Sequence, residues 1–483
     1  LDGILTDIDE IYRREKEAAH IPGMVYGVMS GGQLVHSVAL GLADVERAVP
    51  VDLSTSFRIA SMSKSFIALA IMQLRDRGRL RLEDPVSKYI PHLKLIPVSE
   101  RADDYPVLTI RHLLTHAGGL PQEDPWGDRK LDMSTADFNE LISHGVSHSS
   151  VPGTAFEYSN LGYTLLGQIV EIVSGEPYQC YVKSNIFDPL GMNDTSYEID
   201  EVSTRKLAVG YRWEDRKWSR EEMLHDGTFG AMGGIVTTLE DFSKYVALHL
   251  SAWPAGGSVG DGPVRRDTLR EMHTAAILDA VLVDPAGFSA NPTPAYFANC
   301  YGLGFRVSKY PDGTILVGHA GGLPGFGCDF RFLPTHPGFS ILSFTNRTYG
   351  EMPKVNLMAI KRVLRDVERA PVPISFSLER RSIQLKAILT ETCSIWNKTT
   401  RNCFADNFLV DIPSRIRAIE FHKLLVELGG YISHFSPIVA TNSLRGKFLV
   451  TGVNGRQLEI AFTLSPEKEP KIQHMTTKLL PVA

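Results

Sequence analysis

The spacing of apolar residues changes several times along the chain and predicts a different kind of structure in each stretch. Residues 7–16 follow the period of an amphipathic helix, and short apolar runs at 24–29 and 33–39, separated by Ser30 and two glycines, predict a hairpin. Helical periodicity then dominates from about 61 to 250. The predicted helices cover 61–78, 108–115, 135–144, 160–174 and 238–250. Strand patterns return later, at 301–309, 313–319, 326–333 and 338–345, and precede a predicted helix at 351–368.

Strands at both ends of this region and helices between them predict how the parts assemble. The early and late strands would form one sheet, and the helical block of about 61–250 would lie beside it with a cleft between them. Residues rich in Pro and Gly at 253–262 and 284–294 predict loops, and 370–373 has the composition of a linker. We therefore expect a first domain over 1–370.

Residues 371–483 predict a second, smaller domain with its own core. Asn454 and Gly455 lie between two alternating runs, which is a strong hairpin signal. The predicted helices cover 378–396, 402–411 and 413–428, and the predicted strands cover 446–452, 457–463 and 470–479. Helices followed by an antiparallel sheet indicate an α+β domain.

Composition narrows the functional classes. The chain has 483 residues, of which 43% are hydrophobic and 22% charged, as in soluble globular proteins with two or three domains. A formal net charge of −5 offers no basic field, so we expect no nucleic acid as a partner. No apolar run is long enough for a membrane span. These features favour a cytoplasmic protein, and a removed leader would make it periplasmic or secreted.

Cysteine and histidine usage excludes other chemistry. The five cysteines are few and odd in number and include no Cys-x-x-Cys, which argues against a disulfide framework and a zinc site. The fifteen histidines include no His-Glu-x-x-His. We expect neither a metal nor a cofactor.

Ser61 and Lys64 are the most informative pair in the chain. They lie three residues apart at the start of a long apolar helix, and therefore on one helix face. If Ser61 occupies the first helical turn, unpaired N–H groups and the positive end of the helix dipole face its hydroxyl. A desolvated lysine there should have a lowered pKa and could accept the serine proton. Similar Ser-x-x-Lys spacings at Ser203 and Ser465 lack an apolar helix and predict nothing.

Tyr158 and Asn160 form a second candidate group. They follow a Pro-Gly turn and begin the helix over 160–174, so both would stand on a loop at a helix N-terminus. A tyrosine near a lysine ammonium can move a proton to a leaving group. The Asn160 amide can donate to a substrate carbonyl and accept from the lysine.

The third candidate group is His319 with the glycines after it. A strand carrying Gly321 and Gly322 lets a substrate backbone approach closely, and the Gly322 N–H could donate to an oxyanion opposite the N–H of Ser61. His319 could join the lysine and tyrosine network as a neutral imidazole. The same four letters recur at His116, after the helix over 108–115, where we interpret them as a helix cap and turn.

Two further glycine-rich segments predict no catalytic site. Residues 256–260 match Gly-x-Ser-x-Gly but lack the strand and helix that a nucleophile elbow requires. Residues 227–234 follow no strand of a βαβ unit, so we interpret them as a turn near the floor of the cleft rather than a nucleotide loop.

The ordered trio of Ser61-x-x-Lys64, Tyr158-x-Asn160 and His319-x-Gly321 resembles the three motifs of the serine β-lactamase and penicillin-binding-protein superfamily. The resemblance covers about 8–368 and is greatest to hydrolases related to class C β-lactamases. It implies an α/β (α+β) fold with an antiparallel sheet flanked by helices and an all-helical subdomain. It also implies site roles for seven residues: Ser61 as nucleophile, Lys64 as general base, Tyr158 as acid/base partner, Asn160 as substrate contact, His319 on the oxyanion strand, and Gly321 and Gly322 around the oxyanion hole.

The end of the chain, 443–472, resembles the small cone-shaped domains of the nuclear-transport-factor-2-like (SnoaL-like) type. A lipocalin-like barrel is the alternative, although the helical first half of this domain fits a barrel poorly.

The third motif departs from that of true β-lactamases, which resembles Lys-Thr/Ser-Gly. Ala320 has no hydroxyl to hold a substrate carboxylate, and a histidine replaces the cationic lysine. We therefore expect a serine hydrolase of small or peptidic esters or amides, including D-amino-acid substrates, similar to D-aminopeptidases and related esterases.

Other activities stay open. The acyl group on Ser61 could pass to an amine, as in penicillin-binding-protein-type peptide cyclases, or the protein could be a weak β-lactamase or D-Ala carboxypeptidase. A non-catalytic acylation sensor or binding module is a further alternative. The expected partner is a small-molecule or peptide substrate, with no prediction of oligomeric state. Residues 120–135, 211–229 and 284–300, with Trp126, Trp213 and Phe229, are candidates for the rim of the cleft.

Overall fold

The computed structural model divides into two compact units, Leu1–Glu368 and Arg369–Ala483. It describes residues 2–98, 105–123, 126–202, 206–253, 262–285, 294–334, 336, 338–366, 372, 374–390 and 402–481. The loops predicted at 253–262 and 284–294 and the linker at 370–373 lie mostly outside the described residues, as does the 256–260 motif.

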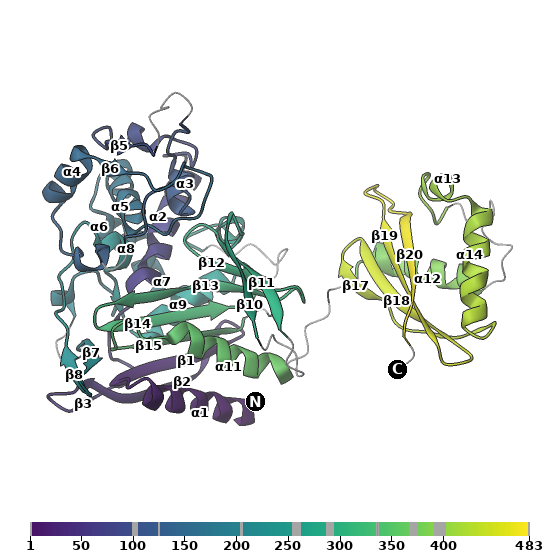
Figure 1. The fold of residues 1–483 in the computed structure, drawn as a ribbon, viewed down its shortest axis with the longest axis horizontal. Coiled ribbons are helices and arrows are strands. Elements are labelled where there is room, and N and C mark those ends of the chain that lie inside the picture. The colour runs from purple at the N-terminus through teal and green to yellow at the C-terminus, as the bar shows by residue number, and fades with distance from the viewer. Residues whose placement is uncertain are drawn as a thin grey trace. The chain divides into compact units, whose positions relative to one another are not determined.

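The first unit is built on a nine-stranded antiparallel sheet with the order β10-β11-β12-β13-β14-β15-β1-β2-β3 (Figure 1). Because β1 pairs with β15, the beginning and the end of this unit lie side by side. The prediction of one sheet assembled from early and late strands is therefore confirmed. The strands are β1 (Gly23–Ser30), β2 (Gln33–Asp44), β3 (Val49–Pro50), β10 (Ile277–Asp284), β11 (Ala295–Tyr301), β12 (Arg306–Lys309), β13 (Ile315–Leu323), β14 (Phe326–Phe332) and β15 (Ser340–Thr345).

Both faces of the sheet are covered, and the alternation of residues along β1 shows how. Met24, Tyr26 and Val28 belong to a core formed with α1 (Asp2–Ala18) and α11 (Met352–Asp366). The intervening Val25 and Met29 belong to the larger core on the opposite face, which contains the helical insert. A strand with apolar side chains on both sides is covered on both faces of its sheet, as β1 is.

The helical insert begins with a 3₁₀ turn, η1 (Ala60–Ser63), that leads directly into α2 (Lys64–Asp76). Every residue of α2 from Lys64 to Leu74 is buried, so this helix is the centre of the insert. Helix α5 (Asn160–Ser174) packs beside it. The other helices are α3 (Ile110–Leu114), α4 (Thr135–His144), α6 (Tyr178–Val182), α7 (Asp188–Leu190), α8 (Gly230–Gly233), α9 (Leu239–Leu250) and α10 (Arg266–Met272). Short strand pairs join β4 (Phe57–Arg58) to β9 (Val236–Thr237), β5 (Leu95–Ile96) to β6 (Val146–Ser147), and β7 (Tyr211–Glu214) to β8 (Lys217–Arg220).

The prediction of one strand over 301–309 is wrong. The segment contains the end of β11, a turn, and β12. Gly304 lies in the turn with a φ of +82°, and a Cβ there would lie 2.6 Å from that of Ala68. The turn therefore packs directly on α2, which a pattern confined to neighbouring residues does not reveal. The strand β10 was not predicted, and β13 continues past its predicted end at 319 to Leu323.

In the described part of the second unit, three helices precede a five-stranded antiparallel sheet. Alternate side chains of its central strands, including Phe448, Val450, Ile460 and Phe462, are buried in one core. The helices are α12 (Phe376–Thr390), α13 (Phe408–Asp411) and α14 (Ser414–Glu427), and the strands are β16 (Ile432–Phe435), β17 (Val439–Asn442), β18 (Arg445–Gly452), β19 (Gln457–Leu464) and β20 (Ile472–Leu479). The NTF2-like assignment of this unit stays a prediction.

Two predictions in the second unit differ from the structure. Only four residues of the helix predicted at 402–411 are α-helical, because Cys403 and Ala405 exchange backbone hydrogen bonds with Ile472 of β20 instead. The strands β16 and β17 were not predicted. The part of the predicted helix after Thr390 lies outside the described residues.

Among the described residues, no helix combines the length and the apolar character that crossing a membrane requires.

Candidate active site

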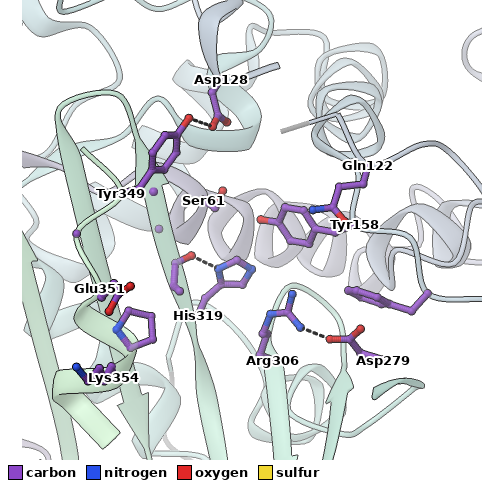
Figure 2. A pocket seen from close by; sticks show the side chains of 16 residues that line it. Ser61, Gln122, Asp128, Tyr158, Asp279, Arg306, His319, Tyr349, Glu351 and Lys354 are labelled. Atoms are coloured by element: carbon purple, nitrogen blue, oxygen red, sulfur yellow. Dashed lines mark hydrogen bonds and ion pairs between the residues drawn. The ribbon is translucent and has the colours of Figure 1, made fainter. Parts of the chain in front are cut away.

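A cleft of about 780 Å³ in the first unit brings together residues from all three sequence motifs (Figure 2). Ser61 comes from η1, Tyr158 from the loop before α5, and His319, Gly321 and Gly322 from β13. The remaining lining residues are Gln122, Asp128, Phe156, Asp279, Arg306, Ala320, Tyr349, Gly350, Glu351, Pro353 and Lys354. The sheet and the helical insert thus each contribute side chains to one site.

Ser61 lies on the 3₁₀ turn η1 rather than in the first turn of an α-helix, so the predicted helix start is wrong by three residues. The preceding Ala60 has a φ of +50°, which is uncommon for a residue with a side chain. The side chain of Ser61 is 9% exposed and faces the cleft. The tight turn therefore presents one small hydroxyl at the cleft surface and directs its neighbours into the core.

Lys64 is fully buried beneath Ser61. Its Nζ lies 2.9 Å from Ser61 Oγ and donates hydrogen bonds to Asn160 Oδ1 at 2.7 Å and to the Met232 carbonyl at 3.1 Å. These three contacts are all to uncharged oxygens. The geometry holds the Nζ atom directly against the serine hydroxyl.

Tyr158 and Asn160 approach Lys64 from α5 and the loop before it. The Tyr158 ring lies 4.8 Å from Lys64 Nζ, and Figure 2 shows its hydroxyl directed across the cleft toward Ser61. Asn160 is the first residue of α5 and is fully buried, whereas Ser159 provides the helix cap by accepting from the Gly162 N–H. The structure thus brings Ser61, Lys64, Tyr158 and Asn160 together.

His319 is buried, and its hydrogen bonds define its tautomer. Nδ1 lies 2.6 Å from the Ala320 carbonyl, which can only accept, so Nδ1 carries the hydrogen. Nε2 then accepts from the Tyr301 hydroxyl at 2.9 Å. Burial holds the pKa of His319 well below its usual value. His319 is therefore a neutral imidazole, and these bonds join it to Tyr301 and the backbone.

Gly321 and Gly322 lie where β13 passes Ser61. A Cβ on Gly321 would lie 2.2 Å from the Ile59 carbonyl oxygen and 3.1 Å from the Ala60 Cβ. Only glycine allows this close approach of the strand to the turn. The pairing of β12 with β13 ends at Arg306 and Gly318, so within the described sheet no strand pairs with that edge of β13 beyond Gly318. An open strand edge therefore runs beside the serine.

The sequence analysis missed several residues of the site. The Met232 carbonyl, a backbone group in the glycine-rich 227–234 segment, binds Lys64, and Tyr301 binds His319. Tyr349 reaches across the cleft and donates to the buried Asp128 carboxylate at 2.8 Å. The crowding of glycines in 227–234 was a usable signal, whereas the other contacts join distant segments and leave no local pattern.

An ion pair lies at the rim of the cleft. Arg306 Nη1 donates to Asp279 Oδ2 at 2.7 Å, and the guanidinium lies within 6 Å of the rings of Phe156, Tyr158 and Tyr301. Arginine stacked on aromatic rings is a common way to fix a charge at a binding surface.

The prediction of the rim was only partly right. Gln122 and Asp128, within 120–135, line the cleft, but no lining residue comes from 211–229. Trp126 and Phe229 contact each other, and Trp213 stacks on His20. None of these three aromatic residues lines the cleft. Phe229 is buried, whereas Trp126 is exposed outside the cleft.

One group with potential metal ligands occurs among the described residues. Glu198, Asp200 and His225 have ligand atoms within 4.8 Å of one another, and none of them lines the cleft. Asp200 and His225 are exposed, Glu198 is half-buried, and His225 bonds to Glu198. An exposed acidic group of this kind does not by itself indicate a metal site.

Comparison with known proteins agrees with the fold and with the arrangement of the site. The family model described as Beta-lactamase matches residues 8–365. The chain therefore belongs to the beta-lactamase family, whose members include penicillin-binding-protein-like serine hydrolases. Its first unit has the β-lactamase/transpeptidase fold, as the sequence motifs predicted.

Individual curated relatives match the chain over shorter stretches than the family model does. The chain is 32% identical over 251 residues to Protein flp of Staphylococcus aureus, which covers 50% of this chain and 48% of that protein. It is 28% identical over 309 residues to Penicillin-binding protein 4* of Bacillus subtilis, covering 61% and 62% of the two chains. The chain thus spans about half to three fifths of the length of these curated relatives.

Solved structures of two penicillin-binding-protein relatives are similar to this chain. An octameric penicillin-binding protein homologue from Pyrococcus abyssi superposes with a TM-score of 0.62 at 22% identity, covering 97% of this chain and 93% of that chain. A penicillin binding protein from Bacillus halodurans gives a TM-score of 0.56 at 27% identity, covering 72% and 98%.

Proposed function

We propose that the protein is a serine hydrolase that works through an acyl-enzyme on Ser61. The observation that carries this proposal is the buried Lys64 Nζ, held 2.9 Å from the Ser61 hydroxyl by the Asn160 amide oxygen and the Met232 carbonyl. Because those two oxygens only accept, they take N–H hydrogens of a neutral amine and leave its lone pair for the serine proton.

The reaction would proceed in two stages. Lys64 Nζ accepts the Ser61 proton as Oγ bonds to the substrate carbonyl carbon, and the oxyanion is stabilised by the N–H groups of Ser61 and Gly322. Tyr158, with its hydroxyl directed toward Ser61, delivers a proton to the leaving alcohol or amine as the scissile bond breaks. The protonated Lys64 then returns a proton to the Tyr158 oxygen. Water attacks the acyl carbon and gives a proton to Lys64, which passes it to Ser61 Oγ as the bond between Oγ and the acyl carbon breaks and the acid leaves.

The substrates we propose are small or peptidic esters and amides, including those of D-amino acids. The open edge of β13 beside Ser61 supports this class, because an extended peptide backbone can pair with such an edge. Ala320 and the neutral His319 argue against efficient β-lactamase or D-Ala carboxypeptidase activity, since neither supplies a hydroxyl or a cation for a substrate carboxylate.

The first experiment tests the nucleophile. The purified chain is incubated with a fluorophosphonate or a fluorescent penicillin, alongside its Ser61→Ala variant. Labelling of the parent and loss of labelling in the variant are expected. Equal labelling of both, with no ester hydrolysed by either, contradicts the proposal.

The second experiment defines the substrate. A panel of p-nitrophenyl esters with D- and L-aminoacyl anilides separates esterase from amidase activity and tests stereochemical preference. Adding an amine acceptor tests for acyl transfer: a new amide product would make the protein an acyltransferase or cyclase. Labelling that is stable, with no turnover on any substrate, would instead indicate an acylation sensor.

A further inference from the structure

His116, which belongs to none of the three motifs, holds the backbone on both sides of Tyr158. The Glu157 N–H donates to the His116 carbonyl at 2.8 Å, and the Ser159 N–H donates to His116 Nδ1 at 3.0 Å. The two residues that flank the proposed proton donor are therefore fixed by the main chain and the side chain of a single histidine. This is the repeat of the His-Ala-Gly-Gly letters that the sequence analysis assigned to a cap and turn.

The conformation of His116 serves these two contacts. Its φ is +56°, in the left-handed region that few residues with side chains adopt. Its side chain is 2% exposed, and its ring centroid lies 4.3 Å from that of Tyr158 and 4.6 Å from that of Tyr301. The imidazole thus contacts the tyrosine ring as well as its backbone.

The rest of the motif binds the same loop. The Gly153 N–H donates to the Ala117 carbonyl at 2.7 Å, and the Ser149 N–H donates to the Gly119 carbonyl at 2.8 Å. These contacts anchor the beginning of the loop, and His116 anchors its end. The turn after α3 is therefore the support on which the segment before α5 rests.

The hydrogen bond at Nδ1 also defines the state of the imidazole. Nδ1 accepts, so the neutral ring carries its hydrogen on Nε2, which has no hydrogen-bond partner among the described residues. Burial lowers the pKa of His116 well below its usual value. The ring therefore stays neutral and keeps Nδ1 as an acceptor at neutral pH.

We propose that His116 is the positioning residue for Tyr158, fixing its hydroxyl for proton delivery to the leaving group. The inference rests on the proposed function, because it assigns the leaving-group proton to Tyr158. It predicts that loss of the Nδ1 acceptor lowers the rate of hydrolysis of substrates whose leaving group needs a proton. The rate should change little for substrates whose leaving group needs none.

The variants His116→Asn and His116→Leu test this prediction. Asparagine tolerates the left-handed backbone and places Oδ1 near the position of Nδ1. Leucine branches at Cγ as histidine does but has no hydrogen-bond acceptor. Both are assayed on a p-nitrophenyl ester and on the methyl ester of the same acid, with thermal unfolding recorded for each.

A misplaced catalytic group can lower the rate by about 10²-fold, so we expect His116→Leu to lose about that factor in kcat on the methyl ester. The loss on the p-nitrophenyl ester should be less than about fivefold, and His116→Asn should stay close to the parent on both.

A second measurement combines each variant with Tyr158→Phe. Without the tyrosine hydroxyl there is nothing left to position, so His116→Leu should lower the remaining activity by less than about threefold. Equal losses on the two esters, or a loss that persists in the Tyr158→Phe background, would overturn the inference and leave His116 as a packing residue. A parent protein that hydrolyses neither ester overturns the proposed function instead, and the inference falls with it.

Discussion

At the scale of single residues, the surroundings of Lys64 decide what the site can do. Its Nζ is enclosed by Ser61, Asn160 and the Met232 carbonyl, and its side chain is fully buried. A buried amine among neutral oxygens acts as a base only if it can exist without its proton.

Replacing Lys64 by arginine tests this directly. A guanidinium stays protonated at any pH that the protein tolerates, so Lys64→Arg should lower the rate of Ser61 acylation by about 10²–10⁴-fold. The measurement is the rate of labelling by a fluorophosphonate. The matched control is Lys183→Arg, an exposed lysine paired with Asp188, whose rate should equal that of the parent. An active Lys64→Arg variant would refute the role of general base.

Ala320 tests, also at the scale of single residues, whether the missing hydroxyl slows the reaction with β-lactams. It lines the cleft on β13 between His319 and Gly321, where a hydroxyl would face a bound ligand. We expect Ala320→Thr to acylate faster with a fluorescent penicillin, since one added hydrogen bond contributes about 1 kcal/mol, or roughly fivefold. An unchanged rate would show that the missing hydroxyl does not limit reaction with β-lactams.

At the scale of elements, the contact between β13 and η1 positions the serine beside the strand. The turn and the strand approach so closely that glycine is required at position 321. Gly321→Ala should therefore push the strand from the turn, lowering the free energy of unfolding by about 1–3 kcal/mol through overpacking. Acylation of Ser61 should fall as well. Denaturant unfolding and probe labelling measure the two effects. Gly3→Ala is the control, because nothing lies within 4 Å of a Cβ there. Undiminished acylation in Gly321→Ala would show that this close contact is dispensable.

At the scale of the whole molecule, buried histidines make the first unit sensitive to acid. His249 Nδ1 lies 2.9 Å from His273 Nε2, and both rings are buried between α9 and α10. Burial lowers the pKa of His249 to about 3 and that of His273 well below its usual value. Because unfolding restores the ordinary pKa of 6.5, the unfolded chain binds more protons at acid pH. The contribution of the two neutral histidines to the free energy of unfolding is fully present above pH 6.5. It is lost as the pH falls from 6.5 toward the pKa values of these histidines in the folded protein.

This linkage gives a measurable slope. The free energy of unfolding should fall by about 1.4 kcal/mol for each pH unit below the ordinary pKa of such a histidine. At pH 5, which is about 1.5 units below that pKa, each histidine should therefore have lowered the free energy of unfolding by about 2 kcal/mol. Unfolding by denaturant at several pH values gives this dependence. His249→Phe removes one titrating group from an aromatic environment and should reduce the slope between pH 7 and 5. An identical slope in the variant would contradict the assignment.

Much of this protein follows from its sequence alone. The apolar periods of 61–78 and 160–174 located α2 and α5 to within a few residues, because a buried helix must repeat its apolar positions locally. The order of the Ser61, Tyr158 and His319 motifs predicted the family that the comparisons identify. Residue type and short-range spacing carry both kinds of information.

Tertiary structure decided what depends on contacts between distant segments. The Met232 carbonyl on Lys64, the Tyr301 hydroxyl on His319 and the two bonds of His116 beside Tyr158 each join residues more than fifteen positions apart. Such partners leave no periodic trace, since any backbone carbonyl or N–H can serve. The sequence by itself therefore determined which residues are candidates for the chemistry. Only the folded chain decided which groups hold them in place.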